Sequence, residues 1–265
     1  MALKFLNINK KFKQWFLKLN LNKEKTATRG EVICVWKPVG LSPLEAILRL
    51  KLQRPDLASE KITYAGRLDP LASGVIVLLV GGARFNKDQY LNLPKTYEVD
   101  ILFGVSTDSG DVLGLIKDLG SKFIDPKSVA ENISQFVGPC RQLAPKFSSP
   151  GLDGKTFYKE VEIYSIKMVD TYNINSVTLL DSIINKINLV TGDFRQAEIL
   201  SKWRSLLGIG TKDWLVVKVV VEASSGTYMR VLAENIGAEL GVPALAYSIK
   251  RTKVGDWGRG DCIDL

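Results

Sequence analysis

The chain has 265 residues, 46% of them hydrophobic and 24% charged, an ordinary globular composition that allows one large domain or two smaller ones. It has no histidine and only three widely spaced cysteines, which excludes a zinc site or a histidine general base and points to a reducing, cytoplasmic setting. No apolar run approaches the ~20 residues of a membrane-spanning helix, so no membrane partner is expected.

The net charge of +8 is concentrated at the N-terminus. Residues 1–29 hold eight Lys and Arg against one Glu, a net +7, so the remaining residues carry only +1. Apolar residues in this arm follow helical spacing and predict a basic amphipathic helix. A helix packed on the domain and a membrane-surface or targeting segment both fit this pattern. We favour an RNA-contacting arm, whose lysines would attract phosphate without selecting a sequence.

The segment after the arm predicts a strand, a turn and a capped helix. Residues 31–36 are expected to form the strand, and Lys37-Pro38-Val39-Gly40 turns the chain out of it. Ser42-Pro43-Leu44-Glu45 then supplies an N-cap, a first-turn proline and a capping glutamate. A helix is therefore expected to begin here.

A short loop ahead of an apolar run is the candidate reactive site. Residues 64–74 lead into residues 75–81, whose apolar character predicts a buried strand. The proline after Asp69 holds that residue extended, and Leu68 and Leu71 can shield it from water. A shielded carboxylate either takes up a proton or needs a cation beside it. From these residues alone, a solvated Asp-Pro turn is the alternative.

The run Gly-Arg-Leu-Asp-Pro-Leu-Ala-Ser-Gly over residues 66–74 resembles the active-site motif of the tRNA pseudouridine-55 synthase (TruB-type) family. The aspartate of that motif is the family's nucleophile, so the resemblance implies this role for Asp69. The family commonly has histidine where this chain has Tyr64, whose ring can still stack on RNA bases. The resemblance also implies substrate contacts for Arg67 and Leu68, and structural support without a chemical step from Lys37, Pro38, Gly66 and Gly74.

Residues 95–104 predict a strand with Tyr97, Val99 and further apolar residues on one face. On its own, Tyr97 would be interpreted as a core aromatic residue at a strand end. Lys-x-Tyr-x-Val at this place resembles the family's second catalytic segment, which implies that Tyr97 lies against the target base and handles a proton. Turn chemistry accounts for the composition of the loop over residues 107–111.

Residues 172–213 are interpreted as an insertion relative to the family's usual catalytic domain. Within them, Thr191-Gly192-Asp193 is expected to cap a helix over about residues 194–207. The basic residues of this helix suit RNA, but a solvated helix with Trp203 in the core is the preferred interpretation.

A further helix is expected over residues 228–240, with Thr227 as its N-cap. Arg230 would then stand on the first turn, where the helix dipole gives a basic residue no benefit. Ser-Gly-Thr-Tyr-Met-Arg resembles the family's Gly-Thr-Tyr-Ile/Val-Arg motif, whose arginine pairs with the catalytic aspartate. The resemblance therefore implies that Arg230 keeps Asp69 charged, with Tyr228 packed beside it.

The last motif, Ile249-Lys250-Arg251, matches the family's Leu-Arg-Arg segment. In the family the leucine packs in the uridine pocket, which implies that Ile249 is the apolar wall here. Lys250 and Arg251 are candidates for phosphate contacts.

These motifs extend over residues 31–265 and imply an α+β pseudouridine synthase fold, a large mixed, mainly antiparallel sheet flanked by helices with a central RNA-binding cleft. Residues 30–265 are expected to form the catalytic domain, without the C-terminal PUA domain that many members carry. The implied activity is conversion of the T-arm uridine of tRNA, position 55, to pseudouridine by a monomer without metal or cofactor. A guide-RNA-dependent synthase and an inactive tRNA-folding chaperone are the alternatives.

Overall fold

The computed structural model describes residues 30–145, 157–208, 210 and 212–265. The basic arm over residues 1–29 lies outside these ranges, so its helix and its RNA contact stay predictions. Among the described residues, no helix combines the length and the apolar character needed to cross a membrane.

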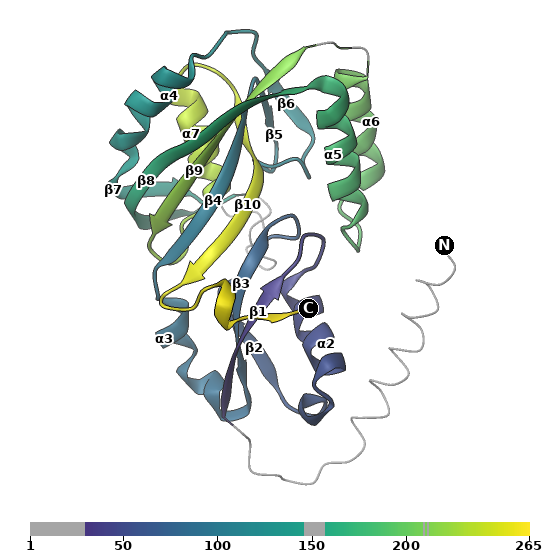
Figure 1. The fold of residues 1–265 in the computed structure, drawn as a ribbon, viewed down its shortest axis with the longest axis vertical. Coiled ribbons are helices and arrows are strands. Elements are labelled where there is room, and N and C mark those ends of the chain that lie inside the picture. Colours follow the sequence, from purple (N-terminus) through teal and green to yellow (C-terminus); the bar gives the residue numbers. More distant parts are fainter. Residues whose placement is uncertain (1–29, 146–156, 209, 211) are drawn as a thin grey trace.

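A long mixed sheet runs through the described part of the chain, with strands in the order β11-β1-β3-β10-β4-β9-β8-β7 and β2 beside β3 (Figure 1). Neighbouring strands are antiparallel except for β1 with β11 and β3 with β10, as expected for a mixed, mainly antiparallel sheet. A small second sheet pairs β5 with β6. The strands are β1 (Glu31–Lys37), β2 (Ile62–Ala65), β3 (Ser73–Val80), β4 (Lys95–Phe103), β5 (Val105–Thr107), β6 (Ile116–Leu119), β7 (Gly138–Leu143), β8 (Tyr158–Asn175), β9 (Asp213–Ala223), β10 (Ala244–Val254) and β11 (Ile263–Asp264).

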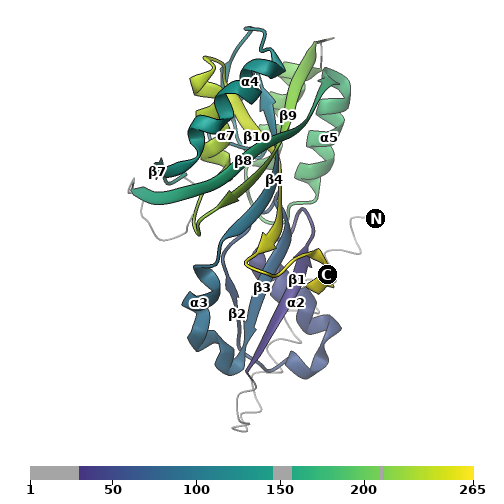
Figure 2. The same cartoon turned by 60° about the vertical axis from the view of Figure 1, so that its left-hand side comes forward.

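Helices cover both faces of the part of the sheet formed by β4, β9 and β10. Helices α4 and α7 lie on one face and α5 on the other (Figure 2). Side chains of α4 and α7 join one core cluster, and those of α5 and α6 form a second. The α-helices are α2 (Pro43–Gln53), α3 (Lys87–Leu91), α4 (Pro126–Asn132), α5 (Ser176–Asn188), α6 (Gln196–Leu207) and α7 (Met229–Glu239). Short 3-10 turns are η1 (Pro55–Leu57), η2 (Gly81–Asn86), η3 (Ile133–Phe136) and η4 (Arg259–Asp261).

The two strands that carry the predicted site are where the sequence placed them. Every side chain from Val75 to Val80 in β3 is fully buried, which confirms the buried strand. In β4, Tyr97 and Val99 share a core cluster with the alternate residues that follow, while Leu102 joins the cluster on the other face. Burial of such side chains contributes about 1.5–3 kcal/mol each, which fixes the strand register.

The helix starts were predicted with mixed success. Ser42 caps α2 in a full capping box with Glu45, as expected. The cap predicted for the helix after residue 193 is wrong, because Arg195 takes a left-handed backbone (φ 63°, ψ 26°) and α6 begins only at Gln196. Thr227 is not the N-cap of α7 either, since its hydroxyl donates to the carbonyl of Ser224 and Tyr228 occupies the cap position.

Candidate active site

The candidate site lies where β10 passes between two parts of the sheet. β10 pairs with β4 over most of its length but with β3 only at Lys250↔Ser73 and Arg251↔Gly74. Because Arg251 also pairs with Tyr97, three strands bring Tyr97, Arg251 and Gly74 into one row. The loop between β2 and β3, which carries Asp69, therefore lies beside the start of β4.

A cavity of about 370 Å³ opens at this junction, within the range of small-ligand pockets. Asp69, Tyr97 and Arg230 all line it, although they come from the β2–β3 loop, β4 and α7. Further predicted residues in the lining are Arg67, Leu68, Gly66, Tyr228, Ile249 and Arg251. The fold thus brings together, within one cavity, residues that are up to 185 positions apart in the sequence.

An ion pair joins the two charged residues of this cavity. Arg230 Nε lies 2.9 Å from Asp69 Oδ2, so the contact expected from the motifs is present. The arginine side chain is only 5% exposed, whereas that of Asp69 is 36% exposed. Burial by itself would lower the pKa of Arg230, but the adjacent carboxylates of Asp69 and Asp111 raise it above its usual value. Arg230 is therefore a permanent cation with a partly accessible carboxylate beside it.

Asp111, a second carboxylate beside Arg230, was not predicted from the sequence. Its Oδ2 lies 3.9 Å from Arg230 Nε, and its Oδ1 accepts hydrogen bonds from Ser109 Oγ (2.7 Å) and the backbone N–H of Leu113 (2.9 Å). Burial raises the pKa of Asp111, an effect that Arg230 opposes and the charge of Asp69 reinforces. Arg230 Nη1 also donates to the carbonyl of Ser109 (2.6 Å). The loop over residues 107–111, whose composition turn chemistry explained, therefore also holds Arg230 in place.

Lys37 supports the Asp69 loop from behind. Its side chain is fully buried, and Nζ donates to the carbonyls of Pro38 (3.0 Å), Leu41 (2.8 Å) and Pro70 (3.3 Å). The backbone N–H of Gly40 donates to the same Pro70 carbonyl (2.8 Å). Burial lowers the pKa of Lys37 to about 7, although the charge of Asp69 opposes this change. These contacts suit the buttress expected of Lys37 and Pro38.

Arg251, a candidate for a phosphate contact, is almost completely buried. Its side chain is 1% exposed and donates to the carbonyls of Val75 (2.7 Å), Arg67 (3.0 Å) and Gly66 (3.4 Å). A guanidinium used in this way fixes the path of the Asp69 loop. Gly74 completes the junction, because at φ 118° a Cβ would lie 2.1 Å from the carbonyl oxygen of Arg251.

Two other predicted contact residues lie outside the cavity lining. Lys250 pairs with Glu98 (2.6 Å), and the alternation of β10 directs it to the opposite face of the sheet from Ile249 and Arg251. Tyr64 is half-buried on β2, with Lys87 Nζ 5.8 Å from its ring centroid. The structure does not bring either residue into the cavity.

Three further residues at the site were not predicted. Gln142 of β7 accepts from the backbone N–H of Tyr228 (2.8 Å) and donates to its carbonyl (3.3 Å), which fixes the start of α7. Lys95 and Lys159 line the cavity. Burial lowers the pKa of Lys95 to about 8, helped by the charges of Arg251 and Lys159. No sequence pattern marks Gln142 or Lys159, because their role comes from packing between distant elements. Lys95 is the lysine of the Lys-x-Tyr-x-Val motif, which by itself gave it no role.

Comparison with known proteins agrees with this geometry. Residues 54–189, just over half of the chain, match the family model described as "TruB family pseudouridylate synthase (N terminal domain)", so the fold is of the pseudouridine synthase class. "tRNA pseudouridine synthase B" of Verminephrobacter eiseniae is 32% identical over 88% of this chain and 63% of its own length. The protein of the same name from Bordetella avium is 30% identical over 88% of this chain and 84% of its own. The chain belongs to the TruB family.

Solved structures share the fold at lower identity. A chain of "Crystal Structure of a Cbf5-Nop10-Gar1 Complex" aligns with a TM-score of 0.57 and 21% identity, over 89% of this chain and 52% of that one. A chain of "Structure of H/ACA RNP bound to a substrate RNA containing 2'-deoxyuridine" gives 0.56 and 19%, over 89% and 50%. This chain therefore spans about half the length of these structures and 63% of the Verminephrobacter relative.

Proposed function

We propose that the protein isomerises uridine 55 in the T-arm of tRNA to pseudouridine, with Asp69 as the nucleophile. The observation that carries the proposal is the ion pair of Asp69 with the buried Arg230, inside a cavity that Tyr97 and Ile249 also line. Family membership and relatives named tRNA pseudouridine synthase B support the choice of reaction and substrate.

In the proposed reaction the target uridine leaves its stack and enters the cavity, as chemistry on a base generally requires. The Asp69 carboxylate attacks either C1′ of the ribose, displacing the base, or the ring itself. The N1–C1′ bond breaks, the base turns, and C5 forms the new bond to C1′. The proton on C5 is removed while N1 gains one, so reactant and product have the same atoms. The carboxylate is released for the next turnover.

Each lining residue has a proposed part in this sequence. Arg230 pairs its charge with Asp69 and orients the carboxylate towards the open side of the cavity. Tyr97 stacks on the base and assists removal of the C5 proton, and Ile249 closes the apolar side. The positive charges of Lys159 and the exposed Arg67 at the cavity suit the RNA backbone. Tyr64 and Lys250 are left as contacts to RNA outside the cavity.

The proposal also covers the domain organisation, the oligomeric state and the location of the enzyme. Residues 30–265 act as the catalytic domain, residues 172–213 are an insertion into it, and the enzyme works as a monomer. The thiols of Cys34, Cys140 and Cys262 are free, which fits the reducing cytoplasm that we propose as its location.

The experiment is to incubate the purified full chain with an unmodified tRNA transcript and map pseudouridine by chemical labelling. We expect one modified position, the T-arm uridine 55, without added RNA, metal or cofactor. Modification only after a guide RNA is added would favour a guide-dependent synthase. Tight tRNA binding with no product would favour a chaperone and contradict the proposal.

A further inference from the structure

The loop that joins α5 to α6 makes a second, less obvious contribution to the site. Arg195 in this loop is the single non-glycine residue with positive φ in the described part of the chain (φ 63°). A left-handed conformation costs a non-glycine residue roughly 1–2 kcal/mol, so it persists where surrounding contacts impose it. The side-chain contacts of Arg195 show which interaction accompanies this strained backbone.

Arg195 forms a two-pronged ion pair with Asp108. Nη1 lies 2.9 Å from Oδ2 and Nη2 lies 3.2 Å from Oδ1, the fork geometry that fixes both partners in orientation as well as distance. Asp108 Oδ1 also accepts the backbone N–H of Leu115 (2.8 Å). The side chains of Arg195 and Asp108 are 36% and 29% exposed, so water screens the pair only in part.

Asp108 belongs to the loop that holds the catalytic arginine. The next residue, Ser109, accepts Arg230 Nη1 through its carbonyl, and Asp111 faces Arg230 Nε. The approach of this loop to α7 is close, because a Cβ on Gly110 would lie 3.1 Å from Arg230 Cβ. A shift of Asp108 would therefore be transmitted to Arg230 through the adjacent residues Ser109 and Gly110.

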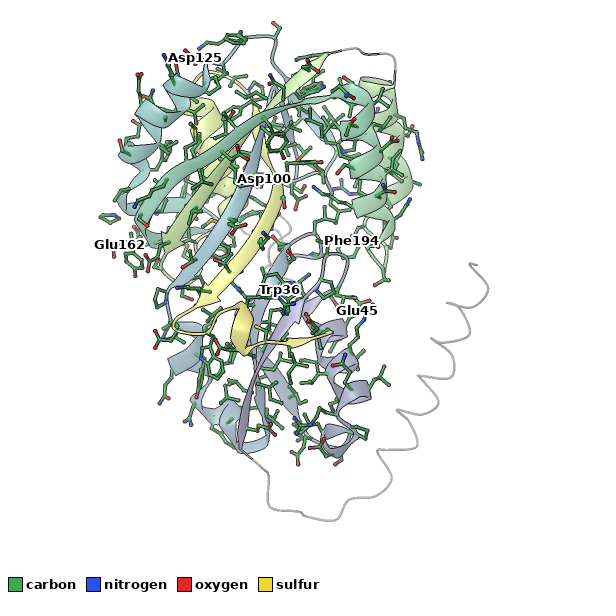
Figure 3. All side chains as sticks on the ribbon, viewed as in Figure 1. Trp36, Glu45, Asp100, Asp125, Glu162 and Phe194 are labelled. Atoms are coloured by element: carbon green, nitrogen blue, oxygen red, sulfur yellow. The ribbon has the colours of Figure 1, made fainter. Side chains whose placement is uncertain are left out.

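The same α5–α6 loop also contacts α2 and the turn at Gly40, which lie on the Asp69 side of the site. The Thr191 hydroxyl donates to the Glu45 carboxylate. Figure 3 shows Phe194 of the α5–α6 loop near Glu45 of α2. At Gly40 a Cβ would lie 2.6 Å from the carbonyl oxygen of Leu189, so the two turns are in direct contact. Gly40 in turn donates to the Pro70 carbonyl next to Asp69.

We propose that the α5–α6 loop braces the Asp69–Arg230 pair from both sides, and that Arg195 is a positioning residue acting through Asp108. The inference rests on the proposed function for its kinetic consequence. It assigns a catalytic purpose to residues 172–213, and it explains why a strained arginine stands at the start of α6. Misplacement of catalytic groups by about 1 Å can cost on the order of 100-fold in rate, so a brace is valuable here.

The test compares Arg195→Ala with Arg204→Ala, a control that removes the same charge from an exposed position on α6. We expect Arg195→Ala to lower kcat about tenfold or more with tRNA affinity within about twofold of wild type, and Arg204→Ala to leave kcat unchanged. Arg195→Lys, which keeps the charge but loses the fork, should recover only part of the rate. A loss confined to tRNA affinity would mean that Arg195 contacts RNA, which would overturn the inference.

Asp108→Asn gives a nearly isosteric second variant in case Arg195→Ala folds poorly. In a double-mutant cycle its loss of kcat should overlap with that of Arg195→Ala, so the double variant should be no slower than the worse single one. Additive losses would show that the two residues act separately and would contradict the brace.

Hydrogen exchange separates failure of the brace from failure of the proposed function. Residues 105–116 should exchange faster in Arg195→Ala than in Arg204→Ala, whatever reaction the enzyme performs. Unchanged exchange there would refute the brace even if pseudouridine is formed. If wild type forms none, the proposed function fails while the exchange result still decides the brace.

Discussion

Lys37 is a fully buried cation that takes no part in the proposed chemistry. Three carbonyl oxygens satisfy its ammonium group, yet burial lowers its pKa from 10.5 to about 7. Between these values the unfolded chain binds a proton that the folded chain does not, so stability attributable to Lys37 rises with pH in this window. Below about pH 7 both states are charged and the burial cost is constant.

Lys37→Met removes this titration and provides the test. As pH rises from 7 to 9.5, wild type should gain unfolding free energy relative to the variant, by a few kcal/mol at most given about 1.4 kcal/mol per pKa unit. Urea unfolding at the two pH values measures the difference. Parallel pH profiles for the two proteins would show that Lys37 has an ordinary pKa in the folded state.

Variants of Arg251 and its neighbour Lys250 distinguish a structural role from a contact to RNA. Arg251→Lys loses the charged hydrogen bonds to the Asp69 loop and should lower the free energy of unfolding by about 3 kcal/mol, with reduced kcat. Lys250→Ala breaks one half-exposed ion pair with Glu98 and should cost less than about 1 kcal/mol. Chemical denaturation and tRNA binding measure both. Normal stability with weakened tRNA binding in Arg251→Lys would restore the phosphate role.

At the scale of elements, the close approach of β3 to β10 requires a glycine at position 74, because a side chain there would clash with the Arg251 backbone. Gly74 and Gly138 have similar backbones (φ 118° and 113°), but a Cβ would clash with Arg251 only at Gly74, whereas at Gly138 nothing lies within 4 Å. Gly138→Ala should therefore cost only the backbone strain, about 1–3 kcal/mol, and Gly74→Ala distinctly more. Thermal unfolding of the two variants gives the comparison. Equal losses would show that the close approach carries no energy.

Elements with a local signal could be predicted from the sequence. The buried strand β3, the alternating strand β4 and the capping box of α2 each depend on residues close in the chain, and all three are confirmed. The contact of Asp69 with Arg230 was reached only through the family resemblance, since 161 positions separate the two residues.

Residues whose role is set by packing could not be predicted. Asp111 and Gln142 resemble ordinary turn and strand residues until α7 is packed against them. Arg251 was a phosphate candidate from its match to the family's Leu-Arg-Arg segment, whereas in the structure it donates to backbone carbonyls that are distant in the sequence. Arg195 has a left-handed backbone, and its side chain pairs with Asp108, 87 positions away. Long-range contacts of this kind leave no periodicity to detect.

At the scale of the whole molecule, charge is divided unevenly between the arm and the body. Replacement of Lys10, Lys11 and Lys13 by Gln should weaken tRNA binding and reduce the slope of log affinity against log salt by up to about two, with kcat unchanged. Replacing the exposed body lysines Lys61, Lys117 and Lys127 in the same way is the matched control, with a smaller expected change. Binding titrations at several salt concentrations provide the slopes. Equal slopes for wild type and the arm variant would exclude an RNA contact by the arm.

The account as a whole depends on the Asp69 carboxylate, and one comparison tests it most directly. Asp69→Asn and the control Asp88→Asn, an exposed aspartate on α3, are assayed with unmodified tRNA transcript for both binding and pseudouridine formation. The account predicts that Asp69→Asn binds tRNA with near-normal affinity and forms no pseudouridine, while Asp88→Asn behaves as wild type. Pseudouridine formed by Asp69→Asn at a rate close to that of wild type would contradict it.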